Sequence, residues 1–138
     1  TEHLETFGFI AHSIKGTSML PILREGKDVA LIGKKPQGRC CRYDVVLYRR
    51  NSGENVLHRI VRVRKKDYII CGDNCNYLEK GITDRQILGV MTGILRDGKE
   101  ISVNDPQYLM YVKGQLRVMR RRVLRAELSR FLHRVIRK

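Results

Sequence analysis

The stretch DVVLYRRNSGENVLHRIVRVRKKDYIIC, residues Asp44–Cys71, decides the fold. It contains short runs rich in β-branched and aromatic residues, as expected of strands, separated by polar turn residues around Asn51–Gly53 and Lys65–Asp67. The expected strands are Asp44–Tyr48, Asn55–Val63 and Tyr68–Cys71. Because strands joined by tight turns pair with each other, the stretch predicts antiparallel β-structure.

The same spacing of strands and turns continues on both sides of this stretch. Further strands are expected at Phe7–Ile14, Asp28–Ile32, Ile87–Leu95 and Glu100–Val103. The pair Asp97-Gly98 is a strong hairpin signal between the last two, whereas residues Gly72–Gly81 are expected to form a loop. The sequence therefore predicts a mainly β fold, a curled antiparallel sheet or barrel.

A helical region is expected after the last strand. Asn104 or Asp105 is a suitable N-cap, and Pro106 suits a first helical position. An apolar stripe is formed by Leu109, Val112, Leu116, Met119 and Val123, and a second set, shifted in phase, by Leu124, Leu128, Phe131 and Val135. We expect one amphipathic helix or two, with arginine on the other face. The predicted organisation is a β domain over residues 1–104 and a basic helical tail over residues 105–138.

The charge of the chain is concentrated in this tail. The 138 residues carry 28 Lys and Arg against 14 Asp and Glu, a net charge of +14. From Lys113 onward there are ten basic residues and one acid, Glu127. A balance of this kind favours an anionic partner, either a membrane surface contacted through residues 106–138 or, less favoured, nucleic acid. No zinc-finger or helix-turn-helix signature and no set of stacking aromatic residues supports nucleic acid.

The remaining composition narrows the class of protein and its location. No apolar run approaches the roughly 20 residues that span a bilayer, and no signal-peptide pattern is found. The four cysteines, Cys40, Cys41, Cys71 and Cys75, match no common zinc or haem spacing, so we expect reduced thiols, no metal and no cofactor. Reduced thiols favour the cytoplasm, and the basic tail favours association with a membrane surface, so we expect a cytoplasmic or peripherally membrane-associated protein without a transmembrane segment.

Three short segments carry residues suited to hydrolytic chemistry. Ser18 lies in Gly16-Thr-Ser-Met-Leu-Pro21, at an expected strand end where the hydroxyl and nearby backbone N–H groups would be exposed. A serine needs a base to accept its proton and donors for the oxyanion. His58, inside the strand Asn55–Val63, is the candidate base. Asp73 in Gly72-Asp-Asn74 is the candidate for the acid that orients the imidazole, with Glu79 as the second candidate.

Taken together and in this order, the segments resemble the signal peptidase I family. Gly16-x-Ser18-Met19-x-Pro21 is similar to the nucleophile box, and Asp44-Val-Val-Leu-Tyr to the Gly-Asp-Val-Val strand with Tyr43 in place of glycine. His58-Arg-Ile-Val is similar to the base segment, Gly72-Asp-Asn74 to the last box, and Ile87-Leu-Gly89 to the strand that closes the site. The resemblance spans about Gly16 to Val90. Histidine rather than lysine at the base position is the feature of the endoplasmic-reticulum and archaeal type, which is related to the self-cleaving repressor peptidases.

The resemblance implies the fold of these peptidases and a serine-type peptidase that cleaves a peptide, leader or precursor protein through an acyl-enzyme. Ser18 would be the nucleophile and His58 the base, while Thr17, Met19 and Pro21 would belong to the oxyanion and substrate-binding segment. The chain departs from the family at two places. Glu79 stands where the histidine type has its second Asp, so the orienting acid is open between Asp73 and Glu79. Gly26-Lys27-Asp28 has one residue more than the usual Gly-Asp.

Two other functions compete with the peptidase. The first is a basic β module that binds nucleic acid or a membrane surface without catalysis, and the second is an inactive relative that binds a peptide strand. A Ser18–His58 separation beyond hydrogen-bond reach would favour the inactive relative.

Overall fold

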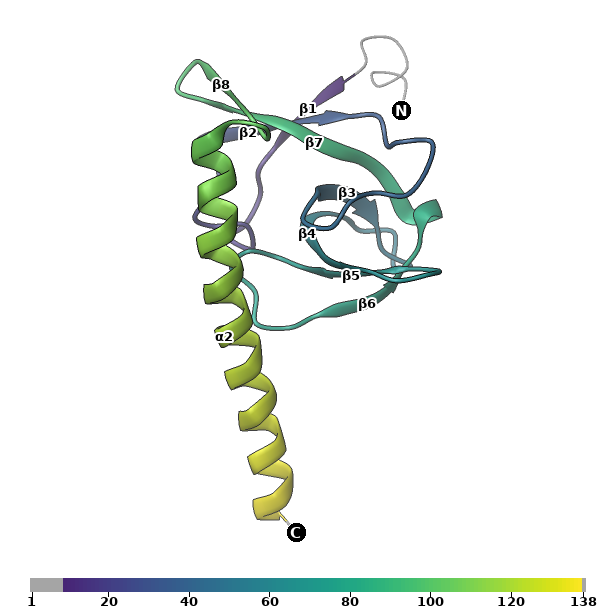
Figure 1. Cartoon of the computed structure of the whole chain (residues 1–138), viewed down its shortest axis with the longest axis vertical. Helices are drawn as coiled ribbons and strands as arrows, with labels where there is room; N and C mark the ends of the chain where they lie inside the picture. The colour runs from purple at the N-terminus through teal and green to yellow at the C-terminus, as the bar shows by residue number, and fades with distance from the viewer. Residues whose placement is uncertain (1–8, 138) are drawn as a thin grey trace.

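A computed structural model describes residues 9–137 as one antiparallel sheet with a long C-terminal helix beside it (Figure 1). The strands are β1 (Phe9–Ser13), β2 (Asp28–Gly33), β3 (Val45–Arg49), β4 (Asn55–Val63), β5 (Tyr68–Cys71), β6 (Glu79–Ile82), β7 (Ile87–Arg96) and β8 (Lys99–Ser102). A short 3-10 helix, η1 (Asp84–Gln86), precedes β7, and the long helix is α2 (Pro106–Arg137). The mainly β prediction is confirmed, although Phe7 of the first expected strand lies outside the described residues.

The sheet is open rather than closed into a barrel. Its strand order is β1-β2-β7-β3-β4-β5-β6, with β8 paired to β7. Within residues 9–137 no pairing joins β1 to β6, so the barrel alternative of the prediction is wrong for the described chain. Strands β3 and β4 form the hairpin expected around Asn51–Gly53, with Val46 opposite His58. At the β7–β8 turn Asp97 and Gly98 both have positive φ, as a two-residue hairpin of this type requires.

Strand β6 was not expected, because residues Gly72–Gly81 were predicted to be a loop. The strand has the sequence Glu-Lys-Gly-Ile, which lacks the alternation of apolar and polar residues that marks a half-buried strand. It lies at the edge of the sheet, pairs only with β5, and contains Gly81 at a positive φ of 81°. Backbone hydrogen bonding to β5, rather than an apolar pattern, therefore defines this strand.

Helix α2 is one continuous helix, and its first half is part of the core. Asp105 caps it, since its carboxylate accepts a 2.8 Å hydrogen bond from the Gln107 N–H, and Pro106 is the first helical residue, as expected. The buried side chains of the helix are Tyr108, Val112, Leu116, Met119 and Val123. The stripe therefore begins at Tyr108, not at Leu109, whose side chain is about half exposed.

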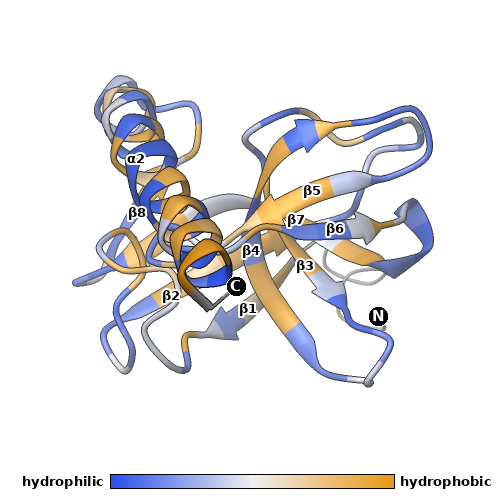
Figure 2. Cartoon of the chain, turned by 90° about the horizontal axis from the view of Figure 1, so that it is seen from below, coloured by the Kyte–Doolittle hydropathy of each residue, from blue (hydrophilic) through white to orange (hydrophobic). Residues whose placement is uncertain are grey.

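The apolar interior lies between the strands and this half of the helix. The strand residues Ile32 and Ile94 pack in one cluster with Ile14 and Leu23, from the segment between β1 and β2, and with Tyr108, Val112 and Leu116 of the helix. A second cluster is formed by Tyr48, Ile60, Tyr68 and Ile70, on the side of β3, β4 and β5. Figure 2 shows the hydrophobic colouring of the strands gathered where they converge. This packing fixes β4 and the loop before β2, which carry the candidate site.

Candidate active site

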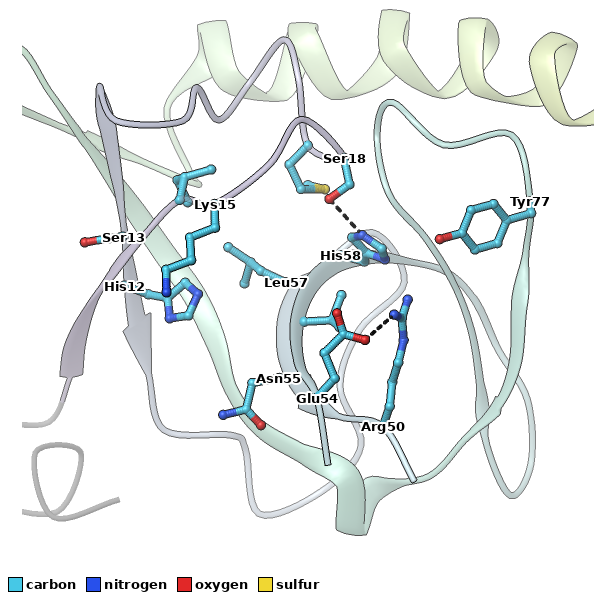
Figure 3. A pocket seen from close by; sticks show the side chains of 13 residues that line it. His12, Ser13, Lys15, Ser18, Arg50, Glu54, Asn55, Leu57, His58 and Tyr77 are labelled. Carbon is cyan, nitrogen blue, oxygen red and sulfur yellow. Dashed lines mark hydrogen bonds and ion pairs between the residues drawn. The ribbon is translucent and has the colours of Figure 1, made fainter. Parts of the chain in front are cut away.

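Ser18 and His58, forty residues apart in the chain, meet in the structure. The Ser18 Oγ lies 3.0 Å from His58 Nε2, within hydrogen-bond distance. His58 projects from β4, and Ser18 lies in the segment between β1 and β2 (Figure 3). The ring of His58 is buried while Ser18 is partly exposed. This is the arrangement in which a neutral imidazole accepts the proton of a nucleophilic hydroxyl.

A cavity of about 640 Å³ opens beside this pair. One wall is formed by residues of β1 and the segment after it, including His12, Ser13 and Lys15, and the other by the β3–β4 hairpin (Figure 3). Tyr77 lies on the opposite side of His58 from Lys15. The cavity is large enough for several residues of an extended peptide beside the hydroxyl.

Burial and a nearby cation keep the imidazole neutral. Burial, the larger cause, and the positive charge of Arg50 together lower the pKa of His58 to about 4. Glu79 acts in the opposite direction but does not offset these two causes. The base is therefore unprotonated at neutral pH, with its lone pair available to the hydroxyl.

The other ring nitrogen of His58 faces a tyrosine that sequence reasoning did not identify. Tyr48 Oη lies 3.4 Å from His58 Nδ1, and the same hydroxyl donates a 2.8 Å hydrogen bond to Glu79 Oε1. Burial, then the bond to Glu79, raise the pKa of Tyr48, so the phenol keeps its proton. Because that proton is committed to Glu79, the tyrosine oxygen faces His58 as an acceptor. The contact therefore favours the tautomer with the proton on Nδ1 and the lone pair on Nε2, towards Ser18.

Glu79 is held by a second partner, Arg50. The Arg50 guanidinium donates to Glu79 Oε1 at 2.9 Å from Nη2 and also pairs with Glu54 at 2.9 Å. Strand β6 brings Glu79 to this point, where the sequence predicted a loop. Of the two acids considered for orienting the imidazole, Glu79 is the one that reaches its Nδ1 side, through Tyr48.

Asp73, the first candidate for the orienting acid, has other partners. Its carboxylate accepts two 2.8 Å hydrogen bonds from the guanidinium of Arg59, and a third of 2.9 Å from Tyr111. Both charged side chains are almost fully buried, at 0% and 1% exposure. In the described part of the chain no hydrogen bond joins Asp73 to His58. Asp73 therefore supports the loop and the helix rather than the imidazole.

The Gly72–Asn74 box nevertheless lies directly against the nucleophile segment. The Asn74 N–H donates to the Ser18 carbonyl at 2.8 Å, and its side-chain amide donates to the Thr17 carbonyl at 3.1 Å. A Cβ added at Gly72 would come within 2.7 Å of the Ser18 carbonyl oxygen and 3.0 Å of the His58 ring. Glycine at this position is therefore required for the loop to approach both residues.

The remaining residues of the nucleophile segment have different positions. Thr17 and Pro21 are exposed, whereas Met19 is buried and its sulfur accepts a 3.3 Å hydrogen bond from the Asp73 N–H. Among the backbone hydrogen bonds of residues 9–137, none is donated by the N–H of Ser18. That N–H is therefore free to donate to an oxyanion formed beside the hydroxyl.

The cysteines and the other possible metal ligands form no redox or metal site within the described residues. All four cysteines are free thiols, and burial raises the pKa of Cys71 to about 12. Within residues 9–137, no group of His, Cys, Asp and Glu side chains has an arrangement that would hold a metal ion. Over the same residues, no helix combines the length and apolar character needed to cross a membrane.

Comparison of the chain with protein-family models, with curated proteins and with solved structures returned no match.

Proposed function

We propose that this protein is a serine peptidase of the signal peptidase I type, with Ser18 as nucleophile and His58 as general base. The observation that carries the proposal is the 3.0 Å contact between Ser18 Oγ and His58 Nε2 at the edge of an open cavity. The lowered pKa of His58 and the uncommitted N–H of Ser18 support it. The resemblance of the five ordered segments to the family points to the same chemistry.

In the proposed reaction, Ser18 Oγ attacks the carbonyl carbon of a peptide bond while its proton passes to His58 Nε2. The oxyanion formed accepts a hydrogen bond from the Ser18 N–H. Collapse breaks the C–N bond, and His58 returns the proton to the leaving amine, which gives an acyl-enzyme ester. Water, deprotonated by His58, then hydrolyses the ester to a carboxylic acid and regenerates the serine.

Tyr48 and Glu79 act in this mechanism as positioning residues. When His58 becomes charged, its Nδ1 proton still faces the tyrosine oxygen, and the carboxylate of Glu79 lies one hydrogen bond further on. The negative charge of Glu79 favours the imidazolium that forms at the transition state. In a Ser/His/acid triad the acid contacts the histidine directly, whereas here the hydroxyl of Tyr48 lies between His58 and Glu79.

The proposal is tested by labelling with a fluorophosphonate probe and by cleavage of a mixture of quenched fluorogenic peptides. Ser18→Ala and His58→Gln are each expected to abolish labelling and to lower cleavage by about 10³-fold or more. Ser13→Ala and His12→Gln are matched controls, because both residues line the same cavity away from the pair, and they should retain labelling. Full cleavage by a folded Ser18→Ala protein would overturn the proposal.

A further inference from the structure

Helix α2 changes the face on which it carries its apolar residues. Up to Val123, the buried side chains point to the strands at spacings of three and four residues. Continuation of that stripe would place Glu127, Arg130 and Arg134 on the same face, and all three are exposed. We call residues 124–136 the distal segment. It extends past the strands and away from them (Figure 1).

The apolar side chains of the distal segment lie on a different side and are uncovered. At about 100° per residue, they fall within an arc of about 140°. Their exposed fractions range from 48% to 79%, and they are Leu124, Leu128, Phe131, Leu132, Val135 and Ile136. Six large exposed apolar residues gather on one side of a single helix, with Arg125 near one edge of the arc, and an exposed apolar face of this size is typical of an interaction site.

Positive charge surrounds this face. Arg125 falls inside the arc near one edge, and Arg121 lies on the same side one turn before the segment. Arg130 and Arg134 lie on the opposite side, and Glu127 is the one acid of the distal segment. None of the ion pairs within residues 9–137 involves an arginine of α2. In the described chain Arg125, Arg130 and Arg134 also make no side-chain hydrogen bond, unlike Arg120 and Arg122, so their charges are available to an external anion.

We propose that the distal segment binds the surface of an anionic lipid bilayer and lies in the plane of the interface. The apolar arc would enter the boundary of the acyl chains, and the arginines would contact lipid phosphates. A helix with a broad apolar arc, arginine-rich flanks and too little apolar length to span is typical of this mode of binding. This inference goes beyond the proposed peptidase activity and does not depend on it.

Two other occupants fit the segment less well. A coiled coil with a second copy would use Leu124, Leu128, Phe131 and Val135, but the preceding seam positions are Arg117 and Arg121. The seam is therefore shorter than the three to four heptads that define a coiled coil, and the arginines of two copies would repel. Nucleic acid would contact the arginines but would leave the apolar arc exposed to water.

The absence of tryptophan in this chain makes a direct test possible. In full-length Phe131→Trp protein, the only indole lies on the apolar arc, and in the control Leu95→Trp it lies on β7. On addition of phosphatidylcholine vesicles containing phosphatidylglycerol, we expect a blue shift of emission and quenching by brominated acyl chains for Phe131→Trp only. Vesicles of pure phosphatidylcholine should give a much smaller response.

Affinity is then measured by co-sedimentation with the same vesicles. Leu128→Ser with Leu132→Ser is expected to weaken partitioning about tenfold or more, and Arg130→Gln with Arg134→Gln about tenfold at low salt. The control pair Leu95→Ser with Leu109→Ser changes two exposed leucines outside the distal segment and should have an effect below about twofold. Unchanged thermal unfolding of each variant establishes that it is folded.

Three results would overturn the inference. The first is the absence of a blue shift with anionic vesicles. The second is concentration-dependent dimerisation in analytical ultracentrifugation that is lost in the Leu128→Ser, Leu132→Ser protein, without vesicle binding. The third is salt-sensitive binding to DNA with no binding to vesicles. Probe labelling of Ser18 is measured separately, so failure here leaves the peptidase proposal unaffected.

Discussion

Replacement of Tyr48 by phenylalanine isolates the positioning role proposed for this residue. Tyr48 is fully buried, and the change removes one oxygen while the ring is kept. It deletes the 3.4 Å contact with His58 Nδ1 and the 2.8 Å bond to Glu79, but Glu79 keeps its pair with Arg50. The variant should therefore fold, with a buried Nδ1–H of His58 that has lost its acceptor.

The expected loss follows from the nature of that contact. An unsatisfied buried donor costs about 1–3 kcal/mol. In Tyr48→Phe this cost falls on the tautomer with the proton on Nδ1, so the ring instead favours an orientation or tautomer that cannot accept the proton of Ser18. If this acts on the transition state, kcat should fall about tenfold to 100-fold, because each 1.36 kcal/mol is a factor of ten. Substrate contacts in the cavity are unchanged, so KM should change little.

The assay is steady-state cleavage of the best peptide from the fluorogenic mixture, with the rate of fluorophosphonate labelling as a second readout. Tyr68→Phe is the matched control. It removes another buried tyrosine hydroxyl of the sheet, which bonds to Arg39, Cys40 and Asp84 and does not line the cavity. If Tyr48→Phe retains full kcat, or if both variants lose activity equally in proportion to their stability, the positioning role is refuted.

Two further predictions concern charges around the site. The value of kcat/KM should fall as pH decreases through about 4, because His58 becomes protonated there. Arg50→Met should move this fall to higher pH, since Arg50 lowers the pKa of His58 and neutralises the charge of Glu79. A pH profile of Arg50→Met identical to that of the unmodified protein would contradict this. Asp73→Asn should lower the free energy of unfolding in urea by about 3–5 kcal/mol, because it leaves the buried Arg59 without its counter-ion. The control Asp67→Asn, which breaks a pair at the surface, should have a far smaller effect on the same free energy.

The strands with a clear pattern were predictable from sequence. Asn55–Val63 and Tyr68–Cys71 have the predicted bounds, because their β-branched residues and the flanking turns agree. Asp97-Gly98 correctly predicted the β7–β8 hairpin, because both residues adopt the positive φ that a two-residue turn requires. Strand Glu79–Ile82 was missed because an edge strand held by its backbone carries little side-chain signal. Closure of the sheet depends on long-range pairing, which no local pattern encodes.

The site was predictable only where residue type and order carry information. Ser18 and His58 were identified from their segments, but the sequence pattern alone does not show that these two segments meet in space. In the sequence, Tyr48 is marked only as the last residue of the expected strand Asp44–Tyr48. A hairpin register around Asn51–Gly53 would have placed Tyr48 two positions from the partner of His58, on the same face. Asp73 was a candidate for the orienting role because the sequence does not show that Arg59, the neighbour of His58, is buried and pairs with Asp73.

Helix α2 is connected to the Ser18 segment through hydrogen bonds to the Gly72–Cys75 loop. Gln115 Nε2 donates to the Asp73 carbonyl at 2.6 Å, and Arg122 Nη1 donates to the carbonyls of Asp73 and Cys75 at 2.8 Å and 3.0 Å. The same loop holds Ser18 through Asn74.

The arginines of helix α2 therefore do not all have the same role. The guanidinium of Arg122 donates to backbone carbonyls of the loop beside Ser18, while Arg125, Arg130 and Arg134 have no such partner in the described chain. The helix up to Val123 belongs structurally to the body that positions Ser18, because its side chains pack with those of the strands and the loop. Only the residues after Val123 are free to serve a second purpose, so changes in the distal segment should leave the geometry of the Ser18–His58 pair intact.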